Sequence, residues 1–246
     1  MPASARQRRP DEPTGGVALV VLAAGSSRRA ETETNKILLP LKGRPVIGWT
    51  FQWTAELPDL VTTVVVCRPE DRAAIGRAIA EEFPDRMVEF APGGSTRHGS
   101  EYAALRILRA RIANGQIDTV AIHDSARPLA SPRLFRDVIA AAQPDGGAVP
   151  AISQHTLVAE RGVLPIGHLA AVQTPQAFGA KLLLAAYDQA DKAGFDGTDT
   201  AACFEHYGDH PVRAVPGDPR NVKLTFPGDL FLLARILERS GGDLDR

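Results

Sequence analysis

Cysteine is scarce in this chain of 246 residues. The two cysteines, Cys67 and Cys203, lie far apart and form no C-x-x-C pair. Neither a disulfide framework nor a cysteine-based zinc site is therefore expected, and a reducing cytoplasm is the compartment that fits best. Both thiols are predicted to be small buried apolar groups rather than nucleophiles. The histidines form no metal-ligand spacing either, and solvated or core positions are expected for His98, His123, His206 and His210.

An excess of charge of either sign is also missing: 28 Lys and Arg residues face 29 Asp and Glu residues, which gives a formal net charge of −1. Proteins that bind nucleic acid usually carry a basic excess or stripe, so a nucleic-acid partner is not expected. No apolar run approaches the roughly 20 residues that cross a bilayer, so no membrane association is expected. Residues 1–16 are rich in Arg and Pro and lack the apolar core of a secretory signal, which predicts a flexible N-terminal tail.

What the chain does contain is an alternation of short apolar runs with amphipathic stretches. Val17–Leu22 is continuously apolar, as expected for a strand that is covered on both faces of a sheet. Strand, helix and strand repeated at this spacing predict an α/β fold, with a doubly wound, mostly parallel sheet in a single domain over residues 17–246. The other predicted strands are Thr62–Cys67, Met87–Ala91, Thr119–His123 and Ala148–Ile152. Two helices are predicted from apolar residues on one helical face: Leu105, Leu108 and Ile112 in the first, and Phe135, Val138, Ile139 and Ala142 in the second. Another helix is predicted after Pro45, and a C-terminal helix is predicted over Pro227–Arg239 with the proline in its first turn.

One region, roughly residues 150–178, departs from this alternation. Its sequence is rich in turn-forming residues and mildly β-like, and it shows no helical period. We therefore predict an excursion from the main domain, in the form of a β-like arm inserted at this point.

A run of small residues follows the first predicted strand, because residues 23–29 read Ala-Ala-Gly-Ser-Ser-Arg-Arg. In a doubly wound fold ligands bind at the carboxyl ends of strands, where small residues let backbone N–H groups cradle phosphate oxygens. The arginines and the nearby Lys36 would neutralise a triphosphate and the charge that develops during its transfer. The glycines of a dinucleotide fingerprint and of a Walker loop are absent. A purely structural strand-to-helix turn stays open as the alternative.

A carboxylate occurs at the end of another predicted strand, where Thr119–His123 runs into Asp124. Mg²⁺ is typically held by one or two carboxylates together with substrate phosphates, so Asp124 is a candidate metal ligand. Arg127 adds a cation close by. The alternative for Asp124 is a structural one, in which it caps the turn before Pro128.

Taken with three further segments, these two resemble a known family. They are similar to the cytidylyltransferases that act on polyol phosphates, above all the 2-C-methyl-D-erythritol 4-phosphate cytidylyltransferases. The resemblance covers nearly the whole chain from Val17 onwards and implies a Rossmann-like nucleotidyltransferase fold with a protruding dimerisation arm. The segments that carry it are Ala23–Gly25 through Lys36, Gly93–Arg97 with Ser100, His123–Pro128, Gln173–Gln176 and Asn221–Thr225.

The resemblance implies a reaction in which CMP is transferred from CTP to a polyol phosphate with release of pyrophosphate and with Mg²⁺ as cofactor. It also implies a homodimer whose arm reaches across, so that Thr156 would serve the neighbouring subunit's site. A phosphate monoester is mostly ionised at neutral pH, since its second pKa is near 6, and no general base is needed. The implied roles are catalysis for Arg29, Lys36 and Lys223, nucleotide binding for Ala23, Ala24, Gly25, Gly94, Ser100 and Ser125, acceptor binding for Arg127, Thr156, Thr174 and Lys223, and metal binding for Asp124.

Departures from the family pattern fall mostly on the acceptor side. Methylerythritol phosphate is the leading acceptor, because the match along the whole chain is best for the family that uses it. Ribitol 5-phosphate or another polyol phosphate is the alternative acceptor. A nucleotide-binding scaffold without catalytic activity is the alternative of a different functional class. A molybdopterin-type nucleotidyltransferase would share the first loop but would not account for Thr174–Gln176 or Asn221–Thr225. Three departures are Asn35 in place of Pro, His155 in place of Asp, and Asp199-Thr200 in place of Asp-Glu. In addition, Ile166 or a neighbouring residue stands where the family has an arginine that binds the acceptor phosphate. Arg161 or His168 would have to take over the role of that arginine.

Overall fold

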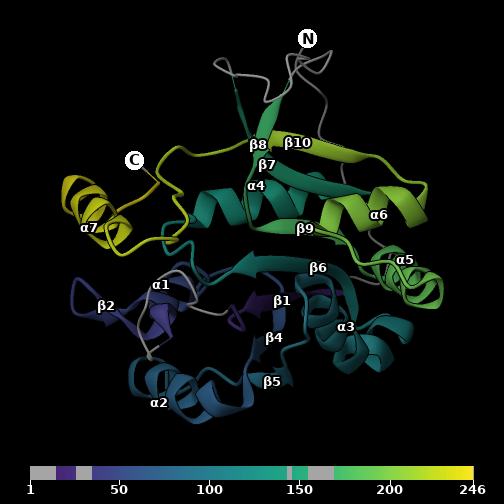
Figure 1. Cartoon of the computed structure of the whole chain (residues 1–246), viewed down its shortest axis with the longest axis horizontal. Helices are drawn as coiled ribbons and strands as arrows, with labels where there is room; N and C mark the ends of the chain where they lie inside the picture. Colours follow the sequence, from purple (N-terminus) through teal and green to yellow (C-terminus); the bar gives the residue numbers. More distant parts are fainter. Residues whose placement is uncertain (1–14, 26–34, 143–145, 155–168, 246) are drawn as a thin grey trace.

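The computed structural model describes residues 15–25, 35–142, 146–154 and 169–245, and its centre is a mixed β-sheet (Figure 1). Within these residues the main sheet has eight strands in the order β10-β7-β9-β6-β1-β4-β5, with β8 beside β7, while β2 and β3 pair separately. The strands are β1 (Gly16–Leu22), β2 (Pro40–Leu41), β3 (Arg44–Pro45), β4 (Leu60–Cys67), β5 (Glu89–Pro92), β6 (Ile117–Asp124), β7 (Gly147–Ser153), β8 (Ala170–Val172), β9 (Gln176–Gly179) and β10 (Val212–Pro216).

Helices cover both faces of this sheet. On one face α3, α5 and α6 bury Tyr187 and Phe204, and on the other α1, α2 and α4 bury Phe51 and Phe135. Helix α7 lies at one end of the molecule beside β2 (Figure 1). None of the described helices is long and apolar enough to cross a membrane. The helices are α1 (Val46–Trp53), α2 (Arg72–Glu82), α3 (Arg97–Ala113), α4 (Pro132–Ala142), α5 (Ala180–Ala193), α6 (Thr200–Gly208) and α7 (Asp229–Arg239), with short 3₁₀ turns η1 (Lys36–Leu38) and η2 (Pro69–Asp71).

The strand order creates a switch point between β1 and β6. From β1 the chain builds outward to β4 and β5, and it then returns to place β6 on the other side of β1. Both neighbours run parallel to β1, and Leu22 lies beside Val66 of β4 and Asp124 of β6. In doubly wound sheets, ligands bind outside the carboxyl ends of the strands at such a switch point.

This architecture confirms the predicted α/β class and the five predicted strands, with ends that differ by a few residues. The helix predicted over Pro227–Arg239 is present as α7, but its predicted start is wrong, since α7 begins at Asp229 and Pro227 lies in the turn before it. The Asp229 carboxylate explains this start, because it accepts hydrogen bonds of 2.7 Å from the backbone N–H groups of Thr225 and Phe226. Such a carboxylate occupies the N–H groups that precede a helix and favours its N-terminus there.

The interval predicted for the arm, roughly residues 150–178, begins within β7 and ends within β9. Pro150–Ser153 continues β7, and Gln176–Phe178 belongs to β9, which is buried between β7 and β6 and antiparallel to both. Between them the structure describes β8, an exposed strand antiparallel to β7, while residues 155–168 lie outside the described residues. The predicted N-terminal tail also ends too late, because Gly16 is the first residue of β1; residues 1–14 lie outside the described part.

Candidate functional site

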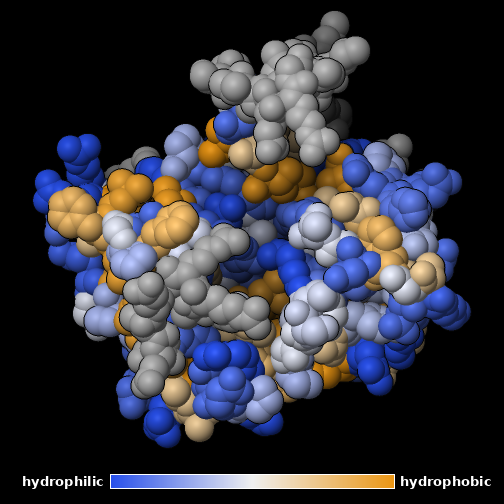
Figure 2. All heavy atoms as spheres, in the orientation of Figure 1, coloured by the Kyte–Doolittle hydropathy of each residue, from blue (hydrophilic) through white to orange (hydrophobic). Residues whose placement is uncertain are grey.

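The first predicted phosphate loop leaves the end of β1. The backbone N–H of Ala23 donates to Val66 O over 2.7 Å, which holds the buried start of the loop against β4, whereas Gly25 is exposed. Lys36 lies half-buried at the start of η1. Arg29 lies outside the described residues. In the space-filling view, hydrophilic residues line a recess near the middle of this face (Figure 2).

Asn35 connects the two described ends of this loop. Its side-chain amide donates to Ala23 O at 3.2 Å and to the Asp71 carboxylate at 2.8 Å. Its Oδ1 atom accepts from the backbone N–H of Ile37 at 3.4 Å and so caps the turn that begins with Lys36. Asn35 is buried. The residue that departs from the family pattern is therefore part of the loop's framework.

The loop between β5 and α3, which holds the segment from Gly93 to Thr96, packs against the loop after β1. A Cβ atom on Gly93 would lie only 2.5 Å from the Cβ atom of Ala24, so the two loops approach too closely for a side chain there. The backbone N–H of Gly94 donates to Ser100 Oγ at 3.0 Å, and this hydroxyl donates to Thr96 O at 2.9 Å. The structure thus brings three predicted nucleotide-binding residues, Ala24, Gly94 and Ser100, into one place.

Asp124 ends β6 and is the centre of an ion-pair cluster. Its Oδ1 atom accepts from Arg97 and its Oδ2 atom accepts from Lys223 Nζ at 2.7 Å. Burial by itself would raise the pKa of this carboxyl group, but Arg97 and Lys223 outweigh burial and hold the pKa well below its usual range. Asp124 is therefore ionised at neutral pH, and Lys223, predicted on the acceptor side, touches the predicted metal ligand.

The cluster extends to a carboxylate without a predicted role. Arg97 Nε lies 2.9 Å from Oε1 of Glu101, one turn later on α3. The hydroxyls of Tyr187 and Thr200 both donate to this buried carboxylate. The spacing of Arg97 and Glu101, four residues apart on one helix, was the sequence signal that could have predicted the pair.

Thr174 supports Asp124 from the neighbouring segment. Its Oγ1 atom accepts from the Asp124 backbone N–H at 3.0 Å and lies 3.2 Å from His123 Nδ1. His123 Nε2 lies 3.2 Å from Arg127 O, so a neutral ring that donates at Nε2 and accepts at Nδ1 satisfies both contacts. Burial lowers the pKa of His123 to about 4, in agreement with a neutral ring. Of the two kinds of position expected for this histidine, solvated or core, the structure shows the core one.

The remaining predicted residues hold the segments together. Ser125 donates both its backbone N–H, at 3.1 Å, and its hydroxyl, at 2.7 Å, to Leu22 O at the end of β1. Arg127 donates to Asn221 O at 2.7 Å, and the Asn221 amide donates to Thr174 O at 2.8 Å. The predicted acceptor-side segments are thus adjacent. Thr156 lies outside the described residues, so its predicted role stays a prediction.

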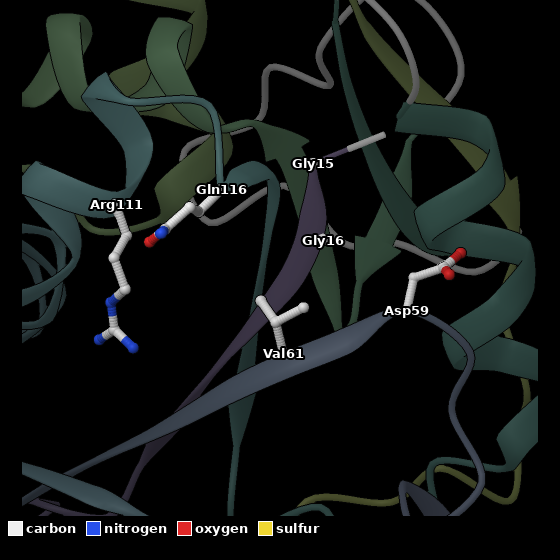
Figure 3. Close-up of a pocket in the computed structure, with 6 residues that line it drawn as sticks. All are labelled: Gly15, Gly16, Asp59, Val61, Arg111 and Gln116. Atoms are coloured by element: carbon white, nitrogen blue, oxygen red, sulfur yellow. The ribbon is translucent and has the colours of Figure 1, made fainter. Parts of the chain in front are cut away.

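A second hollow lies at the other end of the sheet. It is lined by Gly15, Gly16, Asp59, Val61, Arg111 and Gln116 (Figure 3). These residues stand at or beside the amino ends of β1, β4 and β6, whereas ligands of doubly wound sheets bind at the carboxyl ends. The chemistry-bearing residues gather around Asp124 instead, and we take that end as the candidate functional site.

The described residues contain no group of three or more His, Cys, Asp and Glu side chains that could hold a metal ion by itself. A magnesium ion needs less protein than that, because one carboxylate and substrate phosphates are enough. Asp124 fits this pattern: it is ionised, and each of its oxygens has a second lone pair beyond the one that Arg97 or Lys223 occupies. Both cysteines are buried and unpaired by disulfide, as predicted.

Comparison with known proteins gives one consistent result. The family model described as 2-C-methyl-D-erythritol 4-phosphate cytidylyltransferase matches residues 17–239. The enzyme of that name from Synechococcus sp. (strain JA-3-3Ab) is 36% identical over 231 residues, which cover 90% of this chain and 97% of the relative. The one from Geobacillus thermodenitrificans (strain NG80-2) is 36% identical over 224 residues, or 89% and 95% of the two chains.

Solved structures agree with the sequence relatives. The 2-C-methyl-D-erythritol 4-phosphate cytidylyltransferase of Thermus thermophilus superimposes with a TM-score of 0.70 at 31% identity, covering 91% of this chain and 99% of that one. The 4-diphosphocytidyl-2C-methyl-D-erythritol synthase of Anaerococcus prevotii gives a TM-score of 0.75 at 25% identity, covering 92% and 97%. The fold is therefore shared along almost the entire length of both structures.

Proposed function

The chain belongs to the 2-C-methyl-D-erythritol 4-phosphate cytidylyltransferase family, and on this basis we propose that it transfers the CMP group of CTP to 2-C-methyl-D-erythritol 4-phosphate. The observation that carries the proposal is the meeting of three segments at the switch point of the sheet. The loop after β1, the Gly94–Ser100 turn and the Asp124–Lys223 pair all lie at carboxyl ends of strands or pack against them. This is the arrangement that a nucleoside triphosphate and a second phosphate-bearing substrate require.

The nucleotide would lie over the loops that follow β1 and β5. Backbone N–H groups beyond Ala23 would bind the triphosphate, with Lys36 and Arg29 as its cations. The Gly94–Ser100 turn, which is held by the hydrogen bond from Gly94 N–H to Ser100 Oγ, would face the base and would select a pyrimidine over a larger purine. Lys223 and Arg127 would receive the acceptor phosphate next to the α-phosphorus.

In the transfer step an oxygen of the acceptor phosphate attacks the α-phosphorus of CTP and forms a new P–O bond, while the bond to the β-phosphate breaks and pyrophosphate leaves. The attacking group is largely ionised at neutral pH because its second pKa is near 6. The chain has no need of a general base, which agrees with the neutral, hydrogen-bonded His123. Its contribution is alignment of two anions and stabilisation of the charge between them.

Asp124 would hold a Mg²⁺ ion at this place. A bound Mg²⁺ would supply charge neutralisation on the triphosphate. The carboxylate is oriented for this by its neighbours, since the Thr174 hydroxyl holds its backbone and Arg97 and Lys223 hold its oxygens.

We also propose a homodimer in which the arm between β7 and β8 reaches the partner's site, and a cytoplasmic location. The observation that favours the dimer is the exposed strand β8, whose residues 170–172 extend away from the core beside β7 (Figure 1). A mixture of an Asp124 variant with a Thr156 variant would regain activity if two subunits share one site. Absence of recovery in a confirmed mixed dimer would contradict the shared site.

The decisive experiment for the function measures pyrophosphate release from CTP with a panel of polyol phosphates. Methylerythritol phosphate is expected to give the highest kcat/KM, and a higher value for ribitol 5-phosphate would reassign the acceptor. If no polyol phosphate of the panel gives pyrophosphate release while CTP still binds, the protein would instead be a nucleotide-binding module. As a site control, Lys36→Ala should lower kcat by roughly 10²- to 10³-fold, the usual effect of removing one group that stabilises transition-state charge, with unchanged thermal unfolding.

A further inference from the structure

Glu101 is a buried acidic residue that the transfer chemistry does not use directly. It is 1% exposed and lies on α3, one helical turn after Arg97. Three side chains converge on its carboxylate: Arg97 at 2.9 Å, Thr200 through a hydroxyl at 2.7 Å, and Tyr187 through a shorter hydroxyl contact. Because α3, α5 and α6 each contribute one of these contacts, the carboxylate is held where three helices pack together.

Arg97 joins this carboxylate to the candidate site. Its guanidinium reaches Glu101 through Nε and Asp124 through Nη1, so two carboxylates share one cation. Lys223 reaches Asp124 from a different segment and its side chain is 44% exposed. Arg97 is therefore the anchored partner of Asp124, and Lys223 is the one that can leave for solvent or substrate.

Glu101 is one of the two carboxylates in direct ion-pair contact within this cluster. Two cations, Arg97 and Lys223, face two carboxylates, Asp124 and Glu101. Burial raises the pKa of Glu101, and Arg97 with the two hydroxyl donors opposes that by stabilising the ionised form. Without a charge at Glu101, Arg97 would keep Asp124 as its one carboxylate in ion-pair contact, with Asp199 acting at longer range, and it would share Asp124 with Lys223.

We propose that Glu101 is a positioning residue for the transfer reaction, which holds the Arg97 guanidinium between two carboxylates and so fixes the place of Asp124 while Lys223 stays available to the substrates. The part of this inference that concerns catalysis rests on the proposed function. The placement of Arg97 by Glu101 does not depend on which substrates are bound, and it can be tested separately.

The activity test compares the wild type with Glu101→Gln, which keeps the shape and removes the charge. The kcat value should fall roughly 10- to 100-fold, as for other groups that orient a catalytic side chain. The KM for CTP should not rise, because the variant site carries one more net positive charge and attracts the triphosphate at least as well. A merely structural role would instead leave kcat unchanged in the folded fraction.

Asp188→Asn is the matched control. Asp188 also connects α3 to α5, through Tyr102 at 2.8 Å and Arg109 at 2.6 Å, but these partners lie away from Arg97 and the contact is near the surface. Its loss should leave kcat and KM unchanged. An equal fall in kcat for both variants would show that the contact between helices matters and not the charge at Arg97, and would overturn the proposal.

A rescue variant gives the sharpest test, since Thr200 Oγ1 is 2.7 Å from the Glu101 carboxylate. Glu101→Thr should lose activity, and the double variant Glu101→Thr/Thr200→Glu returns a carboxylate to the same place from α6. Recovery of kcat to within a fewfold of the wild type supports the proposal. A folded double variant that remains as slow as Glu101→Thr would contradict it.

The NMR signal of the Arg97 Nε–H group provides a readout without substrates, assigned by its disappearance in Arg97→Lys. In the wild type this proton should exchange slowly with solvent, because Nε is buried and lies 2.9 Å from the Glu101 carboxylate. Exchange should become faster in Glu101→Gln, and an unchanged rate would overturn the placement. If the wild type fails to use CTP while this difference is present, the proposed function fails and the placement of Arg97 stands.

Discussion

The ammonium group of Lys223 lies 2.7 Å from Oδ2 of Asp124, although 99 positions separate the two residues in the chain. The contact is supported by the backbone, since Leu224 N–H donates to Ala126 O at 2.7 Å. The segment before α7 is thereby attached to the loop after β6. The candidate site therefore exists only when the amino-terminal and carboxy-terminal parts of the chain have folded together.

Replacing Asp124 by Asn should abolish transfer and destabilise the protein. The change leaves two cations facing a neutral amide, and removing one partner of a buried ion pair usually costs roughly 3–5 kcal/mol. The lower end of that range is expected, because Lys223 can turn to water and Arg97 keeps the Glu101 carboxylate as a counter-ion. Urea unfolding at pH 7 measures the difference, and an Asp124→Asn protein as stable as the wild type would contradict the assigned pairing.

The stability difference between these two proteins should also depend on pH. The pKa of Asp124 is lower in the folded protein than in the unfolded chain, where an aspartate has a pKa of about 3.9. Its contribution is therefore fully present above that value and is lost as the pH falls further toward the folded pKa. The difference should be constant between about pH 8 and pH 5 and shrink in stronger acid. A difference that grows in acid would contradict this sign.

Gly94→Ala should damage the nucleotide side of the site. A Cβ atom there would lie 2.7 Å from the carbonyl carbon of Gly99 and 2.9 Å from Ser100 N, and backbone atoms cannot move aside as a side chain can. The Gly94–Ser100 turn would have to open, so the KM for CTP should rise at least severalfold. Gly99→Ala is the control, because its Cβ would find its nearest neighbour, Thr96 Oγ1, at 3.4 Å.

The control should be neutral or stabilising, since Gly99 lies in the first turn of α3 and alanine favours a helix by up to about 1 kcal/mol over glycine. Equal kinetic effects of the two substitutions would show that close approach at Gly94 is not the cause.

The sequence could predict those parts of the site whose role depends on a few neighbouring residues. The apolar run of β1, the small residues after it and the aspartate that ends β6 each show their role within a few neighbouring positions. The strand β9 could not be predicted in the same way. Its four residues, Gln176–Gly179, are too few to show a period, and they form a strand because β6 and β7 offer open edges to it.

Most of the charge network around Arg97 could not be predicted from local sequence patterns either, because its members are far apart in the chain. Glu101 meets Thr200 across 99 positions and Tyr187 across 86, and only the packing of three helices brings them together. The structure also explains one departure from the family pattern. Thr200 stands where the pattern has Glu, and its hydroxyl donates to Glu101, so a carboxylate is present at this place but comes from α3.

His98 should make stability fall in mild acid. Its ring stacks on Tyr187 with centroids 4.4 Å apart, and neither ring nitrogen has a hydrogen-bond partner within the described residues. Burial lowers the pKa of His98 below its usual value of about 6.5. The unfolded chain then binds more protons than the folded protein, so the free energy of unfolding rises with pH through this range.

His98→Phe isolates this effect, because phenylalanine retains the stacking and does not titrate. The wild type should lose stability relative to His98→Phe as the pH falls from about 8 to about 5. His123 titrates with the same sign but is present in both proteins, so it cancels in the difference. Parallel stability curves would refute a titrating His98.

Asn35 should set the geometry of the triphosphate loop, because it is bonded to Ala23 at one end and caps the turn of Lys36 at the other. Asn35→Asp keeps the size of the side chain but replaces its donor by a carboxylate oxygen beside Asp71, whose Oδ2 atom is 2.8 Å from the present amide. The loss of a buried hydrogen bond costs roughly 1–3 kcal/mol, and repulsion between the carboxylates adds to it.

Both the stability at pH 7 and the affinity for CTP should therefore fall in Asn35→Asp, measured by urea unfolding and by the KM for CTP. Acid should restore part of the stability, since protonation of one carboxylate removes the repulsion and returns a donor to the position. Asn114→Asp is the control: Asn114 is exposed at the end of α3, and its Oδ1 atom accepts from Gln116 N–H, which an aspartate can do equally well. If Asn35→Asp behaves like Asn114→Asp in both measurements, Asn35 does not hold the loop.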